Sequence, residues 1–209
     1  MKIYALSDEK FTPNELLFAS IKRLCNGGAS MIQYRNKSGS HNEKELSKIS
    51  EFCVSVGVSF IINDDALLAS RVGAAGVHVG KDDGGVGRAR DILGDNAIIG
   101  ASCYDSCELA IKAQNEGASY AAFGAVFSSP TKPNATCCGL EIISKAKELL
   151  KVPVCAIGGI NASNIASVAK AGADYAAVVS TLYTKDQIEQ NLLEPIEQNL
   201  LELKRAIKI

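Results

Sequence analysis

Three features are missing from this sequence of 209 residues, and each absence narrows what the chain can be. No apolar run approaches the roughly 18 residues of a membrane-spanning helix. The start, MKIYALSDEK, has no apolar secretory core before its first acidic residues, so a cytoplasmic protein is expected. The formal net charge is −1, which leaves no broad basic field to hold nucleic acid or an anionic membrane. Any anion site must therefore be local.

Histidine and cysteine patterns that carry catalysis are also missing. The seven cysteines form no CxxC pair, and most lie in apolar segments, so reduced and mostly buried thiols are expected. Cys137 and Cys138 are the one candidate for a reactive pair, but no histidine base lies near them in the sequence. Of the two histidines, His78 lies within a predicted strand and is expected to be packed in the protein core, whereas His41 is expected to be exposed in a loop. No Ser–His–Asp or zinc-ligand spacing occurs.

What the sequence does contain is a regular alternation of short apolar runs and amphipathic helical stretches, with 47% apolar and 22% charged residues. Near-continuous apolar runs are typical of strands that are buried on both faces, and strand–helix alternation favours parallel pairing. The eight predicted strands are Ile3–Leu6, Met31–Tyr34, Phe60–Asn63, Gly76–Val79, Ile98–Ala101, Tyr120–Gly124, Val154–Ile157 and Tyr175–Val179.

An internal repeat favours one α/β architecture over another. The segments GGASMIQY, VGAAGVHV, EGASYAAF and AGADYAAV each place Gly-Ala before a predicted strand, which gives four units of two strands. This pattern predicts a single (β/α)8 TIM barrel over residues 1–209. A doubly wound open sheet is the alternative, but no GxGxxG loop follows the first strand.

The last part of the chain, residues 185–209, is predicted to be a C-terminal helical segment. It carries an eight-residue tandem duplication, IEQNLLEP followed by IEQNLLEL, at residues 188–203. Pro195 has no backbone N–H, so it should kink or break a helix at that point. A tolerated duplication near a terminus explains the repeat without assigning it a function.

Charged and small polar residues follow the predicted strands, and in a TIM barrel these positions meet at one rim. Arg35 offers a planar fork for phosphate oxygens, and Lys37 and Lys132 offer point charges. Asp64 and Asp83 follow neighbouring strands, and Mg²⁺ prefers one or two carboxylates together with water and substrate phosphate oxygens. These residues predict a metal–diphosphate site.

A second anion site is predicted after the seventh and eighth strands. The segments AIGGIN and VVST should place backbone N–H groups at the starts of the following helices, where a monophosphate is favoured. A plain strand–helix turn would also contain these glycines. One diphosphate site beside one monophosphate site suggests a transferase with two substrates.

The motifs QYRNK, INDD, VHVGKDD, GAVFSSPTKP and AIGGIN, in this order, resemble the thiamine phosphate synthase family over roughly residues 1–183. The resemblance implies an Mg²⁺-dependent transferase that joins 4-amino-2-methyl-5-(diphosphooxymethyl)pyrimidine to 4-methyl-5-(2-phosphoethyl)thiazole, expected in its carboxylated form. Thiamine phosphate and diphosphate are the implied products. Diphosphate leaves first, and the thiazole nitrogen then captures a pyrimidine methyl cation. The partners implied are small molecules, and a homo-oligomer stays open.

The resemblance also assigns residues by position, with Arg35, Lys37, Lys132 and Ser102 expected to act in catalysis. The pyrimidine diphosphate contacts are Gln33, Arg35, Lys37, Asn63, Ser102 and Lys132. The metal ligands are Asp64 and Asp83. The thiazole phosphate contacts are Ser129, Pro130, Thr131, Gly159, Val179 and Ser180.

The chain departs from the family pattern where Lys81 replaces a common glutamine, Tyr34 replaces a leucine, and ATCCG at residues 135–139 replaces a more polar loop end. Two alternatives remain open. A thiazole tautomerase-like isomerase on the same barrel needs no metal–diphosphate site, and a non-catalytic phosphate-binding barrel would be expected to have lost at least one of these residues.

Overall fold

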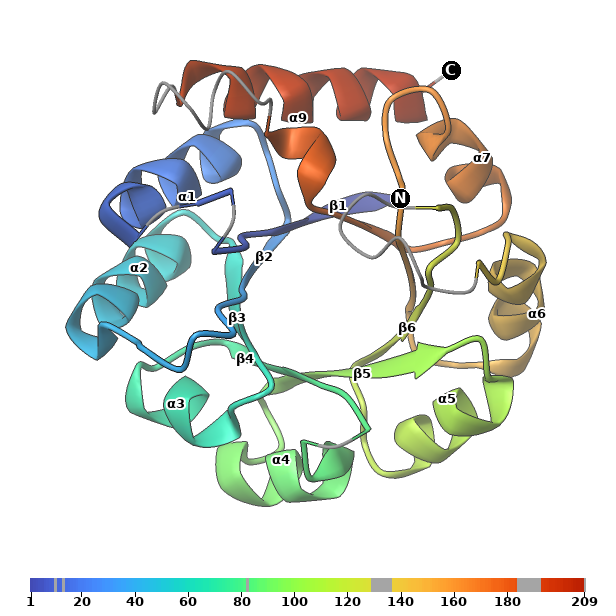
Figure 1. The fold of residues 1–209 in the computed structure, drawn as a ribbon. Helices are drawn as coiled ribbons and strands as arrows, with labels where there is room; N and C mark the ends of the chain where they lie inside the picture. The colour runs from blue at the N-terminus through green and yellow to red at the C-terminus, as the bar shows by residue number, and fades with distance from the viewer. Residues whose placement is uncertain (10, 13, 82, 129–136, 184–192, 209) are drawn as a thin grey trace.

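The computed structural model describes residues 1–9, 11–12, 14–81, 83–128, 137–183 and 193–208. Eight parallel strands form a closed barrel in the order of the sequence, and the first strand pairs with the last. Figure 1 looks down the axis of the barrel, so that the strands form a ring and the helices lie outside it. The predicted TIM barrel is confirmed. The strands are β1 (Lys2–Leu6), β2 (Met31–Tyr34), β3 (Ser59–Asn63), β4 (Gly76–Val79), β5 (Ile98–Tyr104), β6 (Tyr120–Phe123), β7 (Val154–Ile157) and β8 (Tyr175–Val178).

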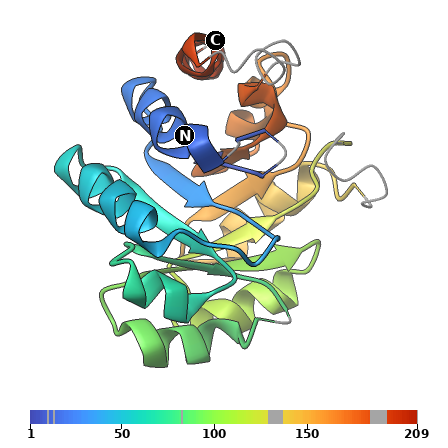
Figure 2. The ribbon, with the colours of Figure 1, turned by 60° about the vertical axis from the view of Figure 1, so that its left-hand side comes forward.

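The helices form the outer layer, and neighbouring helices such as α1 and α2 lie side by side outside the strands (Figure 2). Helix α2 shows why these stretches fold as they do. Its buried residues Leu46, Ile49 and Cys53 recur at helical spacing, and Asn42 caps its first turn by accepting a hydrogen bond from Glu45 N. The helices are η1 (Asn14–Leu16), α1 (Leu17–Asn26), α2 (Glu43–Ser55), α3 (Ala66–Arg71), α4 (Gly85–Leu93), α5 (Cys107–Asn115), α6 (Glu141–Leu149), α7 (Ile165–Lys170), η2 (Ser180–Leu182) and α9 (Glu194–Ile207).

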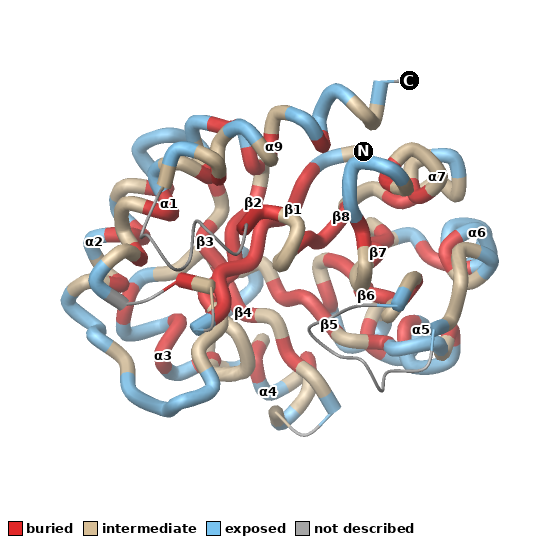
Figure 3. The backbone as a smooth tube through the Cα atoms, turned by 45° about the horizontal axis from the view of Figure 1, so that its top comes forward, coloured by how far each residue is buried: buried red, intermediate tan, exposed pale blue. Residues whose placement is uncertain are grey.

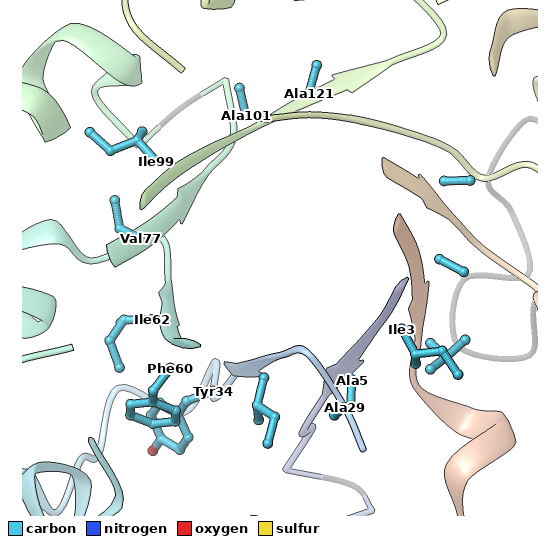
Figure 4. Packing of buried hydrophobic residues seen from close by; sticks show 14 of the residues in the cluster. Ile3, Ala5, Ala29, Tyr34, Phe60, Ile62, Val77, Ile99, Ala101 and Ala121 are labelled. Carbon is cyan, nitrogen blue, oxygen red and sulfur yellow. The ribbon is translucent and has the colours of Figure 1, made fainter. Parts of the chain in front are cut away.

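Side chains alternate along each strand between two apolar layers. Ile3 and Ala5 of β1 belong to the large layer between barrel and helices, whereas Tyr4 and Leu6 belong to a smaller cluster inside the barrel. Figure 4 shows members of the outer layer on the outer side of the ring of strands. The strands are buried almost throughout, as Figure 3 shows, so polar side chains reach a cavity chiefly at the strand ends.

Helix α9 packs against α1 and α7, which lie near the two ends of the chain. Its buried residues Ile196, Leu200 and Leu203 face the barrel, and Arg23 of α1 forms ion pairs with Glu194 and Glu197. Because α9 begins at Glu194, the second copy of the duplication is helical, while residues 188–192 of the first copy lie outside the described residues.

Pro195 lies in the first turn of α9, where a missing N–H costs no intrahelical hydrogen bond. The prediction of a kink or break at Pro195 therefore becomes a helix start in the structure. Within the described part of the chain, no helix is long and apolar enough to cross a membrane.

Candidate active site

A cavity of about 750 Å³ opens where the strands end. Its wall includes residues from every strand or from the segment that follows it. All the predicted site residues that the structure describes lie in this wall. They are Gln33, Arg35, Lys37, Asn63, Asp64, Asp83, Ser102, Gly159, Val179 and Ser180. The structure thus brings together residues far apart in sequence, while their individual roles stay predictions.

The remaining predicted residues, Ser129, Pro130, Thr131 and Lys132, lie outside the described residues. The segment that leads to them is held against β7, because Val126 N and Phe127 N donate hydrogen bonds to the carbonyls of Ile157 and Gly158 at 2.9 and 3.1 Å.

Gly159 fits closely against this segment. It has a φ of +64°, and a Cβ there would come within 2.2 Å of the carbonyl oxygen of Ser128. Only glycine allows both the left-handed backbone conformation and this close approach.

Arg35 is held by an acid that the sequence interpretation missed. The carboxylate of Asp8 is almost fully buried at the end of β1 and forms an ion pair with the Arg35 guanidinium. Asp8 also lines the cavity. The rule used for the other strands would have found it, because Ser7 and Asp8 directly follow β1. A buried carboxylate needs such a partner, so the pair fixes the position of Arg35 at the cavity wall.

Two carboxylates meet at the ends of β3 and β4. Asp64 forms an ion pair with Lys37, and Asp83 Oδ2 accepts a hydrogen bond from the backbone N–H of Gly80 at 2.7 Å. Desolvation raises the pKa of the Asp83 carboxyl, and the neighbouring Asp64 carboxylate raises it further, while the Gly80 N–H and the Lys37 ammonium oppose the shift. The raised pKa of Asp83 shows that its ionised form is disfavoured in this position, and a bound cation would stabilise it.

The second acid of the INDD motif has a structural role. Asp65 Oδ1 accepts a hydrogen bond from Leu68 N at 2.8 Å and so caps α3. Asp64 itself has a φ of +68°, an uncommon backbone conformation for a residue other than glycine. This tight turn directs the Asp65 side chain to the start of α3 and leaves Asp64 in the cavity wall. Asp82, the first acid of the KDD sequence, lies outside the described residues.

The residues Asp64 and Asp83 suit Mg²⁺ in number and chemistry. Across the described residues, no group of three or more histidine, cysteine or acidic side chains is placed to hold a metal. A site for zinc or another ion that takes most of its ligands from protein is thus not formed by them. Mg²⁺ keeps several waters and takes substrate phosphate oxygens, so one carboxylate pair is sufficient.

A chain of hydrogen bonds crosses the floor of the cavity. Ser102 Oγ lies 2.9 Å from His78 Nε2, and His78 Nδ1 lies 2.9 Å from the hydroxyl of Tyr120. Tyr120 donates to the hydroxyl of Tyr4 at 3.0 Å, and Gln33 Nε2 donates to the same oxygen at 2.7 Å. The chain connects two predicted substrate contacts, Ser102 and Gln33, through side chains that sequence analysis did not select.

The expectation that His78 is packed in the core is therefore wrong. The ring is half-buried, lines the cavity and stacks on Tyr120 with 5.6 Å between ring centroids. Each ring nitrogen of His78 therefore has a hydrogen-bond partner, Tyr120 at Nδ1 and Ser102 at Nε2. The pattern of Val77, His78 and Val79 could have indicated this, because a polar residue between two outward-facing ones points into the barrel.

Tyr120 fits inside the barrel because the facing position on β5 is glycine. A Cβ on Gly100 would lie 2.0 Å from Cζ of the Tyr120 ring. Burial strongly raises the pKa of the Tyr120 and Tyr4 hydroxyls, so both stay protonated and act as neutral hydrogen-bonding groups.

The predicted monophosphate edge is partly as expected. Gly159, Val179 and Ser180 line the cavity, and the short helix η2 begins at Ser180, directly after β8. The helix after β7 differs from the expectation that AIGGIN leads directly into it, because α7 begins only at Ile165. Asn164 Oδ1 accepts from Asn161 N at 2.8 Å, and this contact stabilises a turn between Gly159 and the helix. Gly159 therefore lies before this turn, away from the helix start.

His41 also differs from expectation. It is half-buried, because Nδ1 lies 3.2 Å from the hydroxyl of Tyr34 and the two rings meet edge to face.

All seven cysteines are free thiols. Cys137 is exposed, while Cys138 donates to the carbonyl of Ala125 at 3.3 Å and burial raises the pKa of its thiol. That shift makes Cys138 less reactive.

Comparison with known proteins shows what this chain is similar to. The family model described as "Thiamine monophosphate synthase" matches residues 3–182. A Methylococcus capsulatus protein named thiamine-phosphate synthase is 44% identical over 183 residues, which cover 87% of this chain and 81% of the relative. A Thioalkalivibrio sulfidiphilus protein of the same name is 45% identical over 189 residues, 90% of each chain. A solved structure described as thiamine phosphate pyrophosphorylase from Pyrococcus furiosus superposes with a TM-score of 0.82 at 31% identity, covering 99% of this chain and 95% of that one.

Proposed function

This chain belongs to the thiamine monophosphate synthase family and has the activity of a thiamine-phosphate synthase, a transferase, and from this premise we propose how its cavity acts. The substrates proposed are the pyrimidine methyl diphosphate and the thiazole ethyl phosphate. The observation that carries the proposal is the pair of carboxylates, Asp64 and Asp83, which follow adjacent strands and line a cavity together with Arg35 and Lys37.

Asp64 and Asp83 would hold Mg²⁺. When bound, this ion neutralises negative charge on a diphosphate and makes it a better leaving group. The acids support this assignment because the proximity of Asp64 raises the pKa of Asp83, so that the two carboxylates are most stable together when a cation neutralises them.

The basic residues act on the diphosphate. Arg35 offers two parallel N–H donors, and its ion pair with Asp8 keeps the guanidinium in place at the wall. Lys37 adds a point charge, and Lys132, outside the described residues, is proposed to add another. As the bond between the pyrimidine methylene carbon and the diphosphate oxygen breaks, the electron pair moves to the oxygen, and these cations stabilise the charge that develops there.

The remaining residues position the two organic groups. Gln33, Asn63 and Ser102 would bind the pyrimidine, with Gln33 and Ser102 held by the hydrogen-bond chain through His78, Tyr120 and Tyr4. The thiazole phosphate would bind at Gly159, Val179 and Ser180, together with Ser129, Pro130 and Thr131. The thiazole nitrogen then donates its lone pair to the methylene cation and forms the new C–N bond. No general base is required.

The test is a reaction of purified chain with both substrates, with diphosphate and thiamine phosphate measured together. We expect equal amounts of the two products with Mg²⁺ and none in excess chelator. Full activity in chelator would remove the metal from the mechanism. Conversion of the thiazole carboxylate to an isomer without any pyrimidine would instead support the tautomerase alternative.

A separate measurement tests the metal ligands without turnover. Mn²⁺ binding followed by electron paramagnetic resonance should occur in the wild-type chain and be lost in Asp83→Asn. Equal Mn²⁺ binding by both proteins would overturn the assignment of Asp83.

A further inference from the structure

The described wall of the cavity contains four carboxylates and three cationic side chains. Two of the cations are already engaged, because Arg35 is paired with Asp8 and Lys37 with Asp64. A diphosphate that enters must compete with these acids for both. An unpaired cation at the same wall would bind the anion without breaking an existing ion pair.

Lys81 is such a cation. It follows β4 and the intervening Gly80, lines the cavity and has an exposed side chain. It makes no ion pair within 4.0 Å with any residue that the structure describes. The residue before it is held beside the acid pair, since Gly80 N donates to Asp83 Oδ2 at 2.7 Å.

We propose that Lys81 is a further substrate-binding residue of this chain, which contacts the diphosphate group of the pyrimidine substrate beside Asp64 and Asp83. The inference rests on the proposed function, because it requires a diphosphate at this edge of the cavity. The resemblance noted in the sequence analysis implies glutamine at this position, so the contact would be a property of this chain.

An exposed lysine is most often only solvated, and two observations distinguish Lys81 from that case. It lies in the wall of a concave site, where field lines concentrate and a multivalent anion meets several cations together. It also follows β4, with β3 between it and the strand that leads to Lys37, and it lies next to the acid pair Asp64 and Asp83. A polyanion with its dication would therefore be held from both sides, by Lys37 after β2 and by Lys81 after β4.

The experiment measures binding of inorganic diphosphate by calorimetry, with and without Mg²⁺, and the KM and kcat for the pyrimidine substrate. The variant is Lys81→Gln, which introduces the residue implied by the resemblance and removes the positive charge. The control is Lys48→Gln, an exposed lysine of α2 outside the cavity. Unfolding curves show that both variants fold.

We expect Lys81→Gln to weaken diphosphate binding and raise KM by about three- to tenfold, with kcat within about twofold of wild type and Lys81→Arg restoring binding. The control should match wild type. Binding and KM equal to wild type in Lys81→Gln, or a loss confined to kcat, would overturn the inference and leave the proposed function standing. A wild-type chain that neither binds diphosphate nor forms product would overturn both.

Discussion

Lys37 after β2 and Asp64 at the end of β3 form an ion pair across neighbouring strands. The pair joins a cation assigned to the diphosphate with a carboxylate assigned to the metal. Both assignments cannot be satisfied while the two side chains bind each other. We therefore expect the pair to open when metal and substrate enter, with Asp64 turning to the cation and Lys37 to the phosphate oxygens.

Lys37→Gln should have opposite effects on the two ligands. Mn²⁺ binding to the substrate-free chain should become about two- to fivefold tighter, because Asp64 loses its competing ammonium group and an exposed pair of this kind contributes about 0.2–1 kcal/mol. The KM for the pyrimidine diphosphate should rise about tenfold, because a charge-assisted contact is lost. Electron paramagnetic resonance and steady-state kinetics measure the two effects. Weaker Mn²⁺ binding would contradict the exchange.

Asp64→Asn should lower kcat by about 100-fold or more, the scale expected when a main electrostatic stabiliser is removed. The fold should persist, because asparagine tolerates the left-handed conformation at φ +68°. Asp65→Asn is a matched control on the adjacent residue, since asparagine caps helices about as well as aspartate. Kinetics and circular dichroism of both variants test the prediction. Normal turnover in Asp64→Asn would show that this carboxylate is no ligand.

Asp83→Asn should make the metal-free chain more stable at neutral pH while abolishing turnover. Folding raises the pKa of Asp83, so the folded state binds this proton more tightly than the unfolded state. Above the raised pKa the ionised carboxylate destabilises the fold, and this penalty disappears as the pH falls through the ordinary aspartate range. We expect a Tm gain of about 1–3 °C, small because the group is largely screened by solvent.

The check is a series of thermal unfolding curves between pH 4 and 8 in chelator. The gain of Asp83→Asn over wild type should shrink toward acid pH, and Asp95→Asn, an exposed acid away from the cavity, should show no such trend. A gain that grows as the pH falls would have the wrong sign.

Tyr120→Phe should affect both stability and activity. The hydroxyl connects His78 to Tyr4, so its loss removes two hydrogen bonds and should cost about 1–3 kcal/mol of the free energy of unfolding. The kcat/KM should fall about three- to tenfold, because Ser102 and Gln33 lose their common support. Tyr175→Phe, whose ring lies near Tyr120 outside the cavity wall, is the control. Urea unfolding and kinetics equal to wild type would show that the hydrogen-bond chain does not position the site.

Most of the cavity-lining residues could be predicted, because their positions follow from their order along the chain. In parallel strands with right-handed crossovers, the residues after each strand meet at one edge, so Arg35, Asp64, Asp83 and Ser102 could be assigned to one cavity from their order alone. The same rule would have found Asp8 after β1. The sequence analysis selected Asp64 and not Asp65, but the backbone turn that separates the roles of these two residues is seen only in the structure.

The sequence by itself determined the alternation of strands and helices, the closed barrel, the family and the edge on which the charges lie, because periodicity, strand order and motif identity are properties of the chain. Only the tertiary structure decided which charges pair and which stay available. The ion pairs Arg35–Asp8 and Lys37–Asp64 and the hydrogen-bond chain from Ser102 to Gln33 all join different strands, whereas Lys81 has no ion-pair partner among the described residues. Such contacts depend on barrel closure, strand register and the space left by residues such as Gly100, and these are set by the packing of the whole molecule.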